Sequence, residues 1–280
     1  MLLAQLTDLH CAPAGEAAMR VCETNMLTER ALRAVRDFRP HIEALMITGD
    51  LTDNGRASEY AALAEMLART IAVPVYVIPG NHDRRDNLRM ALGHLPGVIA
   101  DPHFVRYVID DLAVRLVMLD TVIPGSSAGE LCEDRMAWLE ARLAEAPERE
   151  TMIGMHHPPF TCGIQHMDRI ALRDIPAFTA LVARHPQVRR IVCGHHHRAI
   201  TVPVAQAIAS ISPSVAHQVE LDISDNPVGL WRLEPAAFQL HLTQAQPGGA
   251  VRLVTHTAYV DSYPGPFPFL IAADYPGRAA

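Results

Sequence analysis

The first two-thirds of the sequence predicts an α/β fold with a largely buried sheet. In this part, short and almost uninterrupted apolar runs alternate with longer segments whose apolar residues recur at helical spacing. Such alternation is typical of strands connected by helices, and runs without polar interruption are typical of sheets covered on both faces. The length of 280 residues allows one large domain, or one domain with an appendage.

The apolar runs give the strands in chain order. Each run is short and ends at a polar residue, a glycine or a proline, as buried strands do. Asp110 and Asp111 separate two of these runs, which indicates a hairpin. The predicted strands are 2–6, 44–47, 73–78, 104–109, 114–119, 152–155 and 190–193.

Four segments between these strands are predicted to be helical. In residues 24–38 the apolar positions recur every three or four residues, so that one face is apolar. Ser58 suits a helix start, and an apolar helical face continues from it to Leu67. The other two predicted helices are 133–144 and 175–183.

The pattern changes near residue 200, where helical periodicity fades. We therefore divide the chain into a main domain, 1–200, and a region, 201–280, of closing strands, a β-rich cap or dimerisation element and an irregular proline-rich tail. Residues 236–243 and 251–259 alternate like the strands of a hairpin around a turn at 246–249. A hairpin alone is marginally stable. We expect this one to pack in a homodimer or higher oligomer and to roof a crevice in the main domain.

Composition excludes several classes of function. The formal net charge is -7, which disfavours a binder of duplex nucleic acid. All 24 basic residues are arginine, so chemistry that depends on lysine is excluded. Neither a membrane-spanning apolar run nor a signal peptide is recognisable. Five scattered cysteines predict free thiols and a cytoplasmic protein.

Five of the apolar runs end abruptly in residues that commonly bind metals. These ends are Thr7-Asp8-Leu9-His10, Gly49-Asp50, Gly80-Asn81-His82-Asp83, His156-His157 and Gly194-His195-His196-His197. In an open α/β sheet, ligands bind outside the carboxyl ends of the strands, so the five ends can meet in one crevice. Taken singly, each motif also fits a turn or an exposed histidine. Together, in this order and each after a strand, they predict a metal site.

The kinds of residue in these ends narrow the choice of metal. Carboxylates, imidazoles and an amide without thiolates suit divalent or trivalent Fe, Mn, Zn or Co. The donors are too many for one tetrahedral ion, and two ions sharing a carboxylate would use them. The ligand types alone do not distinguish among these metals.

The five motifs together resemble the signature of the calcineurin-like metallophosphoesterases, over residues 8–197. The element Met155–Pro159 and the later Pro213–Gln218 make the sequence similar to the branch of class III cyclic-nucleotide phosphodiesterases and glycerophosphodiesterases. The resemblance implies a four-layer αββα sandwich with two metal ions at its edge. After the Asp50 motif, Asp53 stands where purple acid phosphatases have tyrosine, and Asn54 where protein phosphatases have arginine, so both subfamilies are disfavoured.

The resemblance also implies a role for each residue of the motifs. Asp50 would bridge the two ions, His82 would face the phosphate and Asp83 would orient His82. His217, from the region after residue 200, would reach the pocket as a further catalytic residue. One metal would be held by Asp8, His10 and His197, and the other by Asn81, His156 and His195. His157, His196 and Cys11 are left without an assigned role.

Two such ions would activate a water molecule as hydroxide and neutralise phosphate oxygens. The leading hypothesis is a phosphodiesterase that attacks small diesters, such as 3′,5′-cyclic nucleotides (cAMP) or glycerophosphodiesters, with metal-bound hydroxide. The alternatives are a phosphomonoesterase or nuclease of the same superfamily, or a non-catalytic interaction protein on this fold. The acidic net charge disfavours a nuclease acting on long polymers, and the filled ligand positions disfavour a non-catalytic protein.

Overall fold

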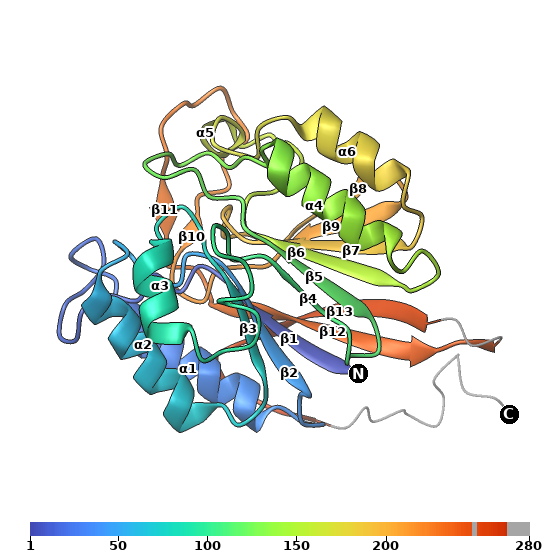
Figure 1. Cartoon of the computed structure of the whole chain (residues 1–280). Helices are drawn as coiled ribbons and strands as arrows, with labels where there is room; N and C mark the ends of the chain where they lie inside the picture. Colours follow the sequence, from blue (N-terminus) through green and yellow to red (C-terminus); the bar gives the residue numbers. More distant parts are fainter. Residues whose placement is uncertain (248–250, 268–280) are drawn as a thin grey trace, which may run out of the picture.

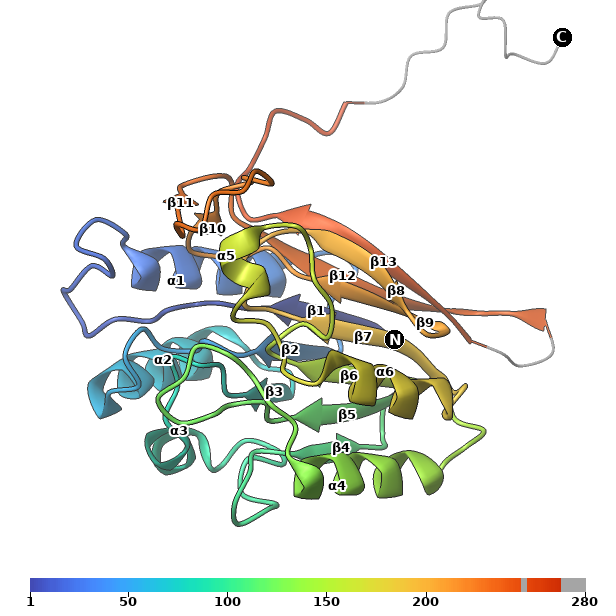
Figure 2. The same ribbon diagram turned by 90° about the horizontal axis from the view of Figure 1, so that it is seen from above.

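The computed structural model describes residues 1–247 and 251–267 and shows two sheets packed face to face, with helices on both outer faces (Figure 1). The first sheet has the order β13-β12-β1-β2-β3 and the second has the order β4-β5-β6-β7-β9-β8. Helices α1, α2 and α3 cover the first sheet, and α4 and α6 cover the second (Figures 1 and 2). The predicted four-layer αββα sandwich is therefore confirmed.

The strands of the two sheets agree closely with the apolar runs of the sequence. In the first sheet they are β1 (Leu2–Leu6), β2 (Ala44–Thr48), β3 (Val75–Ile78), β12 (Ala237–Ala245) and β13 (Val251–Tyr259). In the second sheet they are β4 (Tyr107–Ile109), β5 (Arg115–Leu119), β6 (Thr151–Met155), β7 (Val188–Cys193), β8 (Ile200–Val204) and β9 (Ala207–Ile211). A small ribbon, β10 (Gln218–Val219) and β11 (Trp231–Arg232), stands apart from both.

The helices connect these strands. They are α1 (Thr24–Asp37), α2 (Ala57–Thr70), α3 (Arg85–Leu92), α4 (Glu133–Ala144), α5 (Gln165–Asp168) and α6 (Ile175–Ala183). The sequence pattern predicted α1, α2, α4 and α6, but not α3 or α5. Among the described residues, none of these helices is long and apolar enough to cross a membrane.

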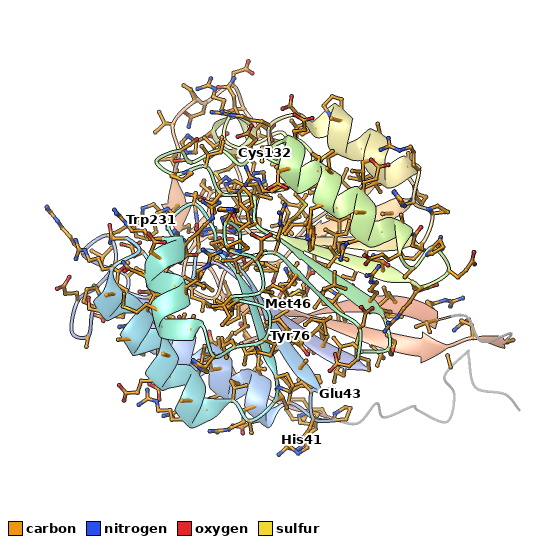
Figure 3. All side chains as sticks on the ribbon, in the orientation of Figure 1. His41, Glu43, Met46, Tyr76, Cys132 and Trp231 are labelled. Carbon is orange, nitrogen blue, oxygen red and sulfur yellow. The ribbon has the colours of Figure 1, made fainter. Side chains whose placement is uncertain are left out.

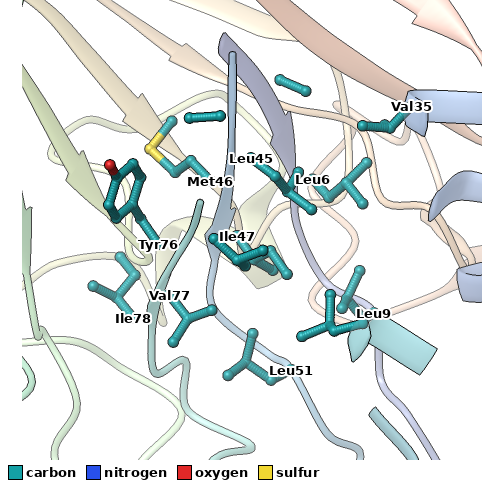
Figure 4. Close-up of a cluster of buried hydrophobic side chains, with 14 of the residues drawn as sticks. Leu6, Leu9, Val35, Leu45, Met46, Ile47, Leu51, Tyr76, Val77 and Ile78 are labelled. Carbon is teal, nitrogen blue, oxygen red and sulfur yellow. The ribbon is translucent and has the colours of Figure 1, made fainter. Parts of the chain in front are cut away.

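The core lies between the sheets and under the helices. Every residue of β1, β2 and β3 is buried, as expected for parallel strands covered on both faces. Leu45, Ile47 and Val77 belong to one packed cluster with residues of α1 and α2 (Figure 4). A few polar side chains also bridge the sheets: Nε2 of Gln5 donates a hydrogen bond to the carbonyl of Cys193 (3.0 Å).

The C-terminal hairpin exists, but its predicted position as a roof is wrong. Strand β12 pairs antiparallel with β1, with Leu2 opposite Leu242 and Gln5 opposite Gln239. The hairpin therefore extends the first sheet, and Ala245 and Val251, where its two strands meet the predicted turn, lie at the end away from the carboxyl end of β1. Part of that predicted turn, 248–250, lies outside the described residues. Burial of Phe238 and Leu240 in the main core supplies the apolar partner that the hairpin needs.

Candidate metal centre

The five polar strand ends meet at one edge of the sandwich. Three follow the parallel strands β1, β2 and β3 of the first sheet, and two follow β6 and β7 of the second. Because the sheets pack face to face, the carboxyl ends of both sets open on the same crevice. The side chains of the seven predicted metal ligands contribute to this crevice, and all except Asn81 are buried.

The backbone at these strand ends is unusual. Five predicted ligands have a positive φ, between 46° and 70°: Asp8, His10, Asp50, His195 and His197. This left-handed conformation is uncommon for residues with a side chain and costs free energy, so it persists only where surrounding contacts enforce it. Here the amides of Asp8 and His10 donate to the carbonyls of Gly49 and Asp50, each at 3.0 Å. The turns of β1 and β2 thus hold one another in place.

Glycines make room for the ligands, as their positions in the motifs suggest. Gly49 has a φ of +97°, and a Cβ there would lie 2.4 Å from Nδ1 of His156. A Cβ on Gly194 would lie 2.0 Å from Oγ1 of Thr7. Gly80 is needed for the same spatial reason, because its Cβ would meet the backbone of Asp50. Glycine is therefore required at 80 and 194 because neighbouring atoms lie too close for a Cβ, and not because the backbone there has a positive φ.

Four donors form the first group of the centre. The ligand atoms of Asp8, His10, Asp50 and His197 all lie within 4.8 Å of one another. Nε2 of His197 is 3.3 Å from Oδ1 of Asp8 and 3.2 Å from Nε2 of His10. These atoms lie close enough together to bind one ion, so the assignment of Asp8, His10 and His197 to the first metal stays a prediction that this geometry allows.

The second group adjoins the first through Asp50. Nε2 of His156 lies 3.4 Å from Oδ2 of Asp50 and 3.2 Å from Oδ1 of Asn81. The ring centroid of His195 is 5.1 Å from that of His156. The same Oδ2 of Asp50 is 3.7 Å from Nε2 of His10 in the first group. Asp50 is thus within reach of both groups, as a bridging carboxylate must be.

Three imidazoles are oriented from outside the cluster by backbone carbonyls. Nδ1 of His156 donates to Thr48 (2.8 Å), Nδ1 of His197 donates to His217 (2.8 Å), and Nε2 of His195 donates to Ile170 (3.0 Å). A carbonyl only accepts, so these nitrogens carry a proton, and the opposite nitrogens face the cluster, where each would supply a lone pair to a bound metal. The donor set of lone pairs, carboxylates and an amide oxygen fits Mn, Fe, Co or Zn.

The charges of the cluster favour a cation. Burial alone would raise the pKa of Asp50, but nearby imidazoles, His156 first among them, hold that pKa well below its usual value. For His195 the main effect is burial, which lowers its pKa well below the usual range and keeps the ring neutral. In turn, although burial opposes it, Asp50 raises the pKa of His156 to about 9, so a cation bound between them would replace the proton that balances this buried carboxylate.

His82 lies beside the cluster and outside both groups. Its ring is exposed, its amide donates to Oδ1 of Asp50 (2.9 Å), and its Nδ1 donates to the carbonyl of Asp53 (2.6 Å). The expectation that Asp83 orients this ring stays a prediction, and the hydrogen bonds of Asp83 in the structure show only an indirect route for it. The carboxylate of Asp83 is buried and accepts hydrogen bonds from the Leu51 amide (3.0 Å) and the Gly80 amide (2.9 Å). Asp83 therefore fixes the loops that carry Asp50 and His82.

The structure also places His217 and the three residues without an assigned role. His217 reaches the site as predicted, with its ring centroid 4.6 Å from that of His197. His157 is held at both nitrogens, by Thr121 (2.7 Å) and Ser127 (3.2 Å), so it supports the cluster from behind. Cys11 is buried in the core. His196 is also buried, and its Nδ1 lies 3.5 Å from Sγ of Cys162.

The sequence pattern does not indicate four further residues that line the site. Met19, His166, Leu230 and Trp231 line the same cavity as His10, Asp50 and His197. Each is a single residue in an irregular or very short segment, so no periodic pattern or motif marks it. Their proximity arises only when the ribbon β10–β11 and helix α5 fold over the carboxyl ends of the strands.

Comparison with known proteins finds a family model and named relatives that agree with one another. A family model described as calcineurin-like phosphoesterase matches residues 1–199. A probable glycerophosphodiester phosphodiesterase, GpdQ, from Arcobacter nitrofigilis is 33% identical over 270 residues, covering 96% of this chain and 97% of the relative. The 3′,5′-cyclic adenosine monophosphate phosphodiesterase CpdA of Escherichia coli K12 is 30% identical over 194 residues, 69% of this chain and 68% of the relative.

Solved structures show the same architecture. A dimetal phosphatase from Danio rerio aligns with a TM-score of 0.65 and 16% identity, covering 93% of this chain and 99% of that one. A purple acid phosphatase from yellow lupin aligns with a TM-score of 0.58 and 15% identity, over 92% of this chain and 53% of its own. At these identities the likeness establishes a common fold.

Proposed function

Because the chain belongs to the calcineurin-like phosphoesterase family, we propose that it hydrolyses small phosphodiesters at a centre of two metal ions. The observation that carries the proposal is the position of Asp50, whose Oδ2 lies 3.7 Å from Nε2 of His10 and 3.4 Å from Nε2 of His156. One carboxylate within reach of two separate groups of donors is the arrangement that a shared pair of ions requires.

We assign the two ions to the two groups of donors. Asp8, His10 and His197 would hold one ion, Asn81, His156 and His195 the other, and Asp50 both. When bound, such ions lower the pKa of coordinated water and neutralise the charge of a phosphate. Residues 1–200 carry all seven ligands, so this part is the proposed catalytic region, to which residues 201–280 add His217.

The side chain of His82 acts on the substrate instead of the metal. Its Nδ1–H is already engaged by the carbonyl of Asp53, which aims Nε2 into the open part of the crevice. A doubly protonated ring would donate from Nε2 to a phosphate oxygen or to the leaving alkoxide, which general acid catalysis requires. Asp83 keeps His82 in this position through the loops that it ties together.

The relatives favour a diester as substrate. Proteins named as glycerophosphodiester and cyclic-nucleotide phosphodiesterases match this chain over most of its length. Glycerophosphodiesters are the leading class, because the relative that matches 96% of the chain bears that name, and cyclic nucleotides are the second candidate. A net charge of -7 argues against duplex nucleic acid as the substrate.

We also propose that the protein forms a homodimer or higher oligomer. Several large apolar side chains after residue 220 are exposed, among them Ile223 (74%), Val228 (60%) and Leu233 (60%). Apolar surface of this kind is typical of contacts between subunits. Sedimentation of the purified protein tests this point, and a monomer at micromolar concentration would contradict it.

The test of the function compares a diester with a monoester. Protein loaded with Mn²⁺ is expected to hydrolyse bis(p-nitrophenyl) phosphate with a higher kcat/KM than p-nitrophenyl phosphate, and to lose activity when the metal is chelated. Elemental analysis of protein purified without added metal identifies the ions and their number. A higher kcat/KM for the monoester, or activity that survives complete removal of metal, would overturn the proposal.

A further inference from the structure

Two cavities meet beside the metal centre. The first, the metal chamber, has a volume of about 350 Å³ and contains His10, Asp50 and His217. The second, the outer groove, has a volume of about 690 Å³ and runs away from the metal ligands. The two cavities share four of their lining residues, namely Asp53, Asn81, His82 and Ser127. A phosphorus atom bound next to Asn81 and His82 would therefore lie at the junction of the two cavities.

The outer walls of the two cavities differ in chemistry. Besides the ligands, apolar and aromatic side chains line the metal chamber, including Met19, Leu230 and Trp231. The outer groove continues past polar and charged ones, including Asn54, Arg84 and Ser126. One side of the junction thus suits an apolar group, and the other suits a group with hydroxyls.

Trp231, which is labelled in Figure 3, is one of the residues that line the metal chamber. It lies on β11 opposite Val219 of β10, and its ring contacts His217 edge to face, with centroids 5.5 Å apart. The preceding Gly229 packs against His166, because a Cβ there would lie 2.5 Å from Nε2 of that ring. With 38% of its surface exposed, Trp231 keeps part of its ring free to contact a ligand.

A salt bridge fixes the ribbon that carries Trp231. The guanidinium of Arg198, which follows the ligand His197, is 3.0 Å from the carboxylate of Glu234 and also donates to the carbonyl of Val219. Both ends of the ribbon are thereby tied to the segment that carries a metal ligand. The position of the indole relative to the centre is therefore set by the fold.

From this arrangement, and resting on the proposed function, we infer that Trp231 determines substrate specificity. The preferred substrates are unsymmetrical, acyclic phosphodiesters. One ester arm carries a flat apolar or aromatic group that packs on Trp231, and the other is a polar, hydroxyl-bearing arm that extends into the outer groove. A cyclic diester has both ester oxygens on one ring, so it would fill only one of the two cavities.

The test uses two diesters that share a glycerol arm and differ in the second alcohol. One carries 2-phenylethanol and the other ethanol, so that the reacting bonds are alike. Replacing Trp231 by alanine is expected to lower kcat/KM for the phenylethyl diester roughly 2- to 12-fold, the range for one aromatic pair. The ethyl diester should change less than about twofold, and Trp231→Phe should restore most of the preference. Leu221→Ala, at an exposed residue nearby that does not line the chamber, is the matched control.

A second measurement reports binding without turnover. The chain has two tryptophans, Trp138 in α4 and Trp231. In the Trp138→Phe protein, a non-hydrolysable phosphonate with a phenylethyl arm should change the fluorescence of Trp231 with the same concentration dependence as its inhibition. If the phosphonate inhibits and the fluorescence does not change, the assignment of Trp231 is wrong.

The outcomes separate the two proposals. If the metal-loaded protein hydrolyses neither these diesters nor bis(p-nitrophenyl) phosphate, the proposed function fails, and the specificity assigned to Trp231 fails with it. If it hydrolyses bis(p-nitrophenyl) phosphate but neither glycerol diester, the function stands and the inferred specificity is overturned. If it hydrolyses both and Trp231→Ala leaves the ratio of their kcat/KM values unchanged, the function stands and only the role of Trp231 is overturned.

Discussion

The Oδ2 atom of Asp50 lies 3.4 Å from Nε2 of His156, at the point where the two groups of ligands meet. The two residues come from different sheets, since Asp50 follows β2 and His156 follows β6. The contact therefore depends on the packing of the two sheets, and so does the distance between the two proposed metal positions. Asp50 is the residue whose loss should affect both positions at once.

We expect Asp50→Ala to abolish diesterase activity and to reduce bound metal to one ion or none per chain. The shared carboxylate is removed from both groups, and no nearby carboxylate occupies its position between them. Elemental analysis and activity of the purified variant check this. Asp111→Ala, which removes an exposed carboxylate in the loop between β4 and β5, should keep both properties. Two tightly bound ions in an active Asp50→Ala protein would contradict the ligand assignment.

His82→Ala should retain metal and lose about 10²- to 10⁴-fold in kcat, the range for a general acid or base. The carbonyl of Asp53 orients the ring toward the open crevice. A ligand atom of His82 also lies within 4.8 Å of those of His10 and Asp53, so the metal content of the variant decides whether the ring is a ligand. Metal content and kcat are measured on the same preparation. Loss of metal together with activity would show that His82 is a ligand.

Gly194→Ala should destabilise the fold by about 1–3 kcal/mol, as overpacking usually does. The new Cβ would lie 2.0 Å from Oγ1 of Thr7 and 3.0 Å from the carbonyl of Thr48, and it would also crowd Asp8, so metal binding should weaken as well. Urea unfolding and metal titration measure the two effects. The control is Gly15→Asn, because Gly15 has open space around it and asparagine tolerates its φ of +83°. Equal stability of the two variants would refute the steric argument.

His241 should make the protein less stable in mild acid. Burial, aided by Arg190, lowers the pKa of this histidine to about 3, whereas in the unfolded chain it is about 6.5. Below about pH 6.5 the unfolded state therefore binds a proton at His241 that the folded state does not bind. Stability is complete above that pH and falls as the pH decreases toward 3.

When the pH is lowered from 7.5 to 5.5, protonation of His241 in the unfolded chain should lower the free energy of unfolding by about 1.4 kcal/mol. His241→Gln, which keeps a polar side chain near Gln5, should lose that part of the pH dependence in urea unfolding. The exposed His94, replaced in the same way, serves as the control. An identical pH dependence in the wild type and the His241 variant would rule out the assignment.

Local sequence patterns predicted most of the framework. Helices α4 and α6 begin and end at the predicted residues. The ligands were recognisable because each directly follows a buried strand. The pairing of β12 with β1 was not predictable in this way, since it joins residues more than 230 positions apart and neither strand carries a signal for the other. The mouth of the site depends on similar long-range contacts, and Trp231 was missed for that reason.

The place of β1 has a consequence for synthesis on the ribosome. This strand is made first, yet in the finished sheet it lies between β2 and β12. Ala237, the first residue of β12, follows Leu6 by 231 positions. At typical elongation rates one edge of β1 remains without its partner for roughly 10–50 s. During that time the nascent chain presents an unpaired apolar edge, so dependence on chaperones should be greatest before β12 emerges.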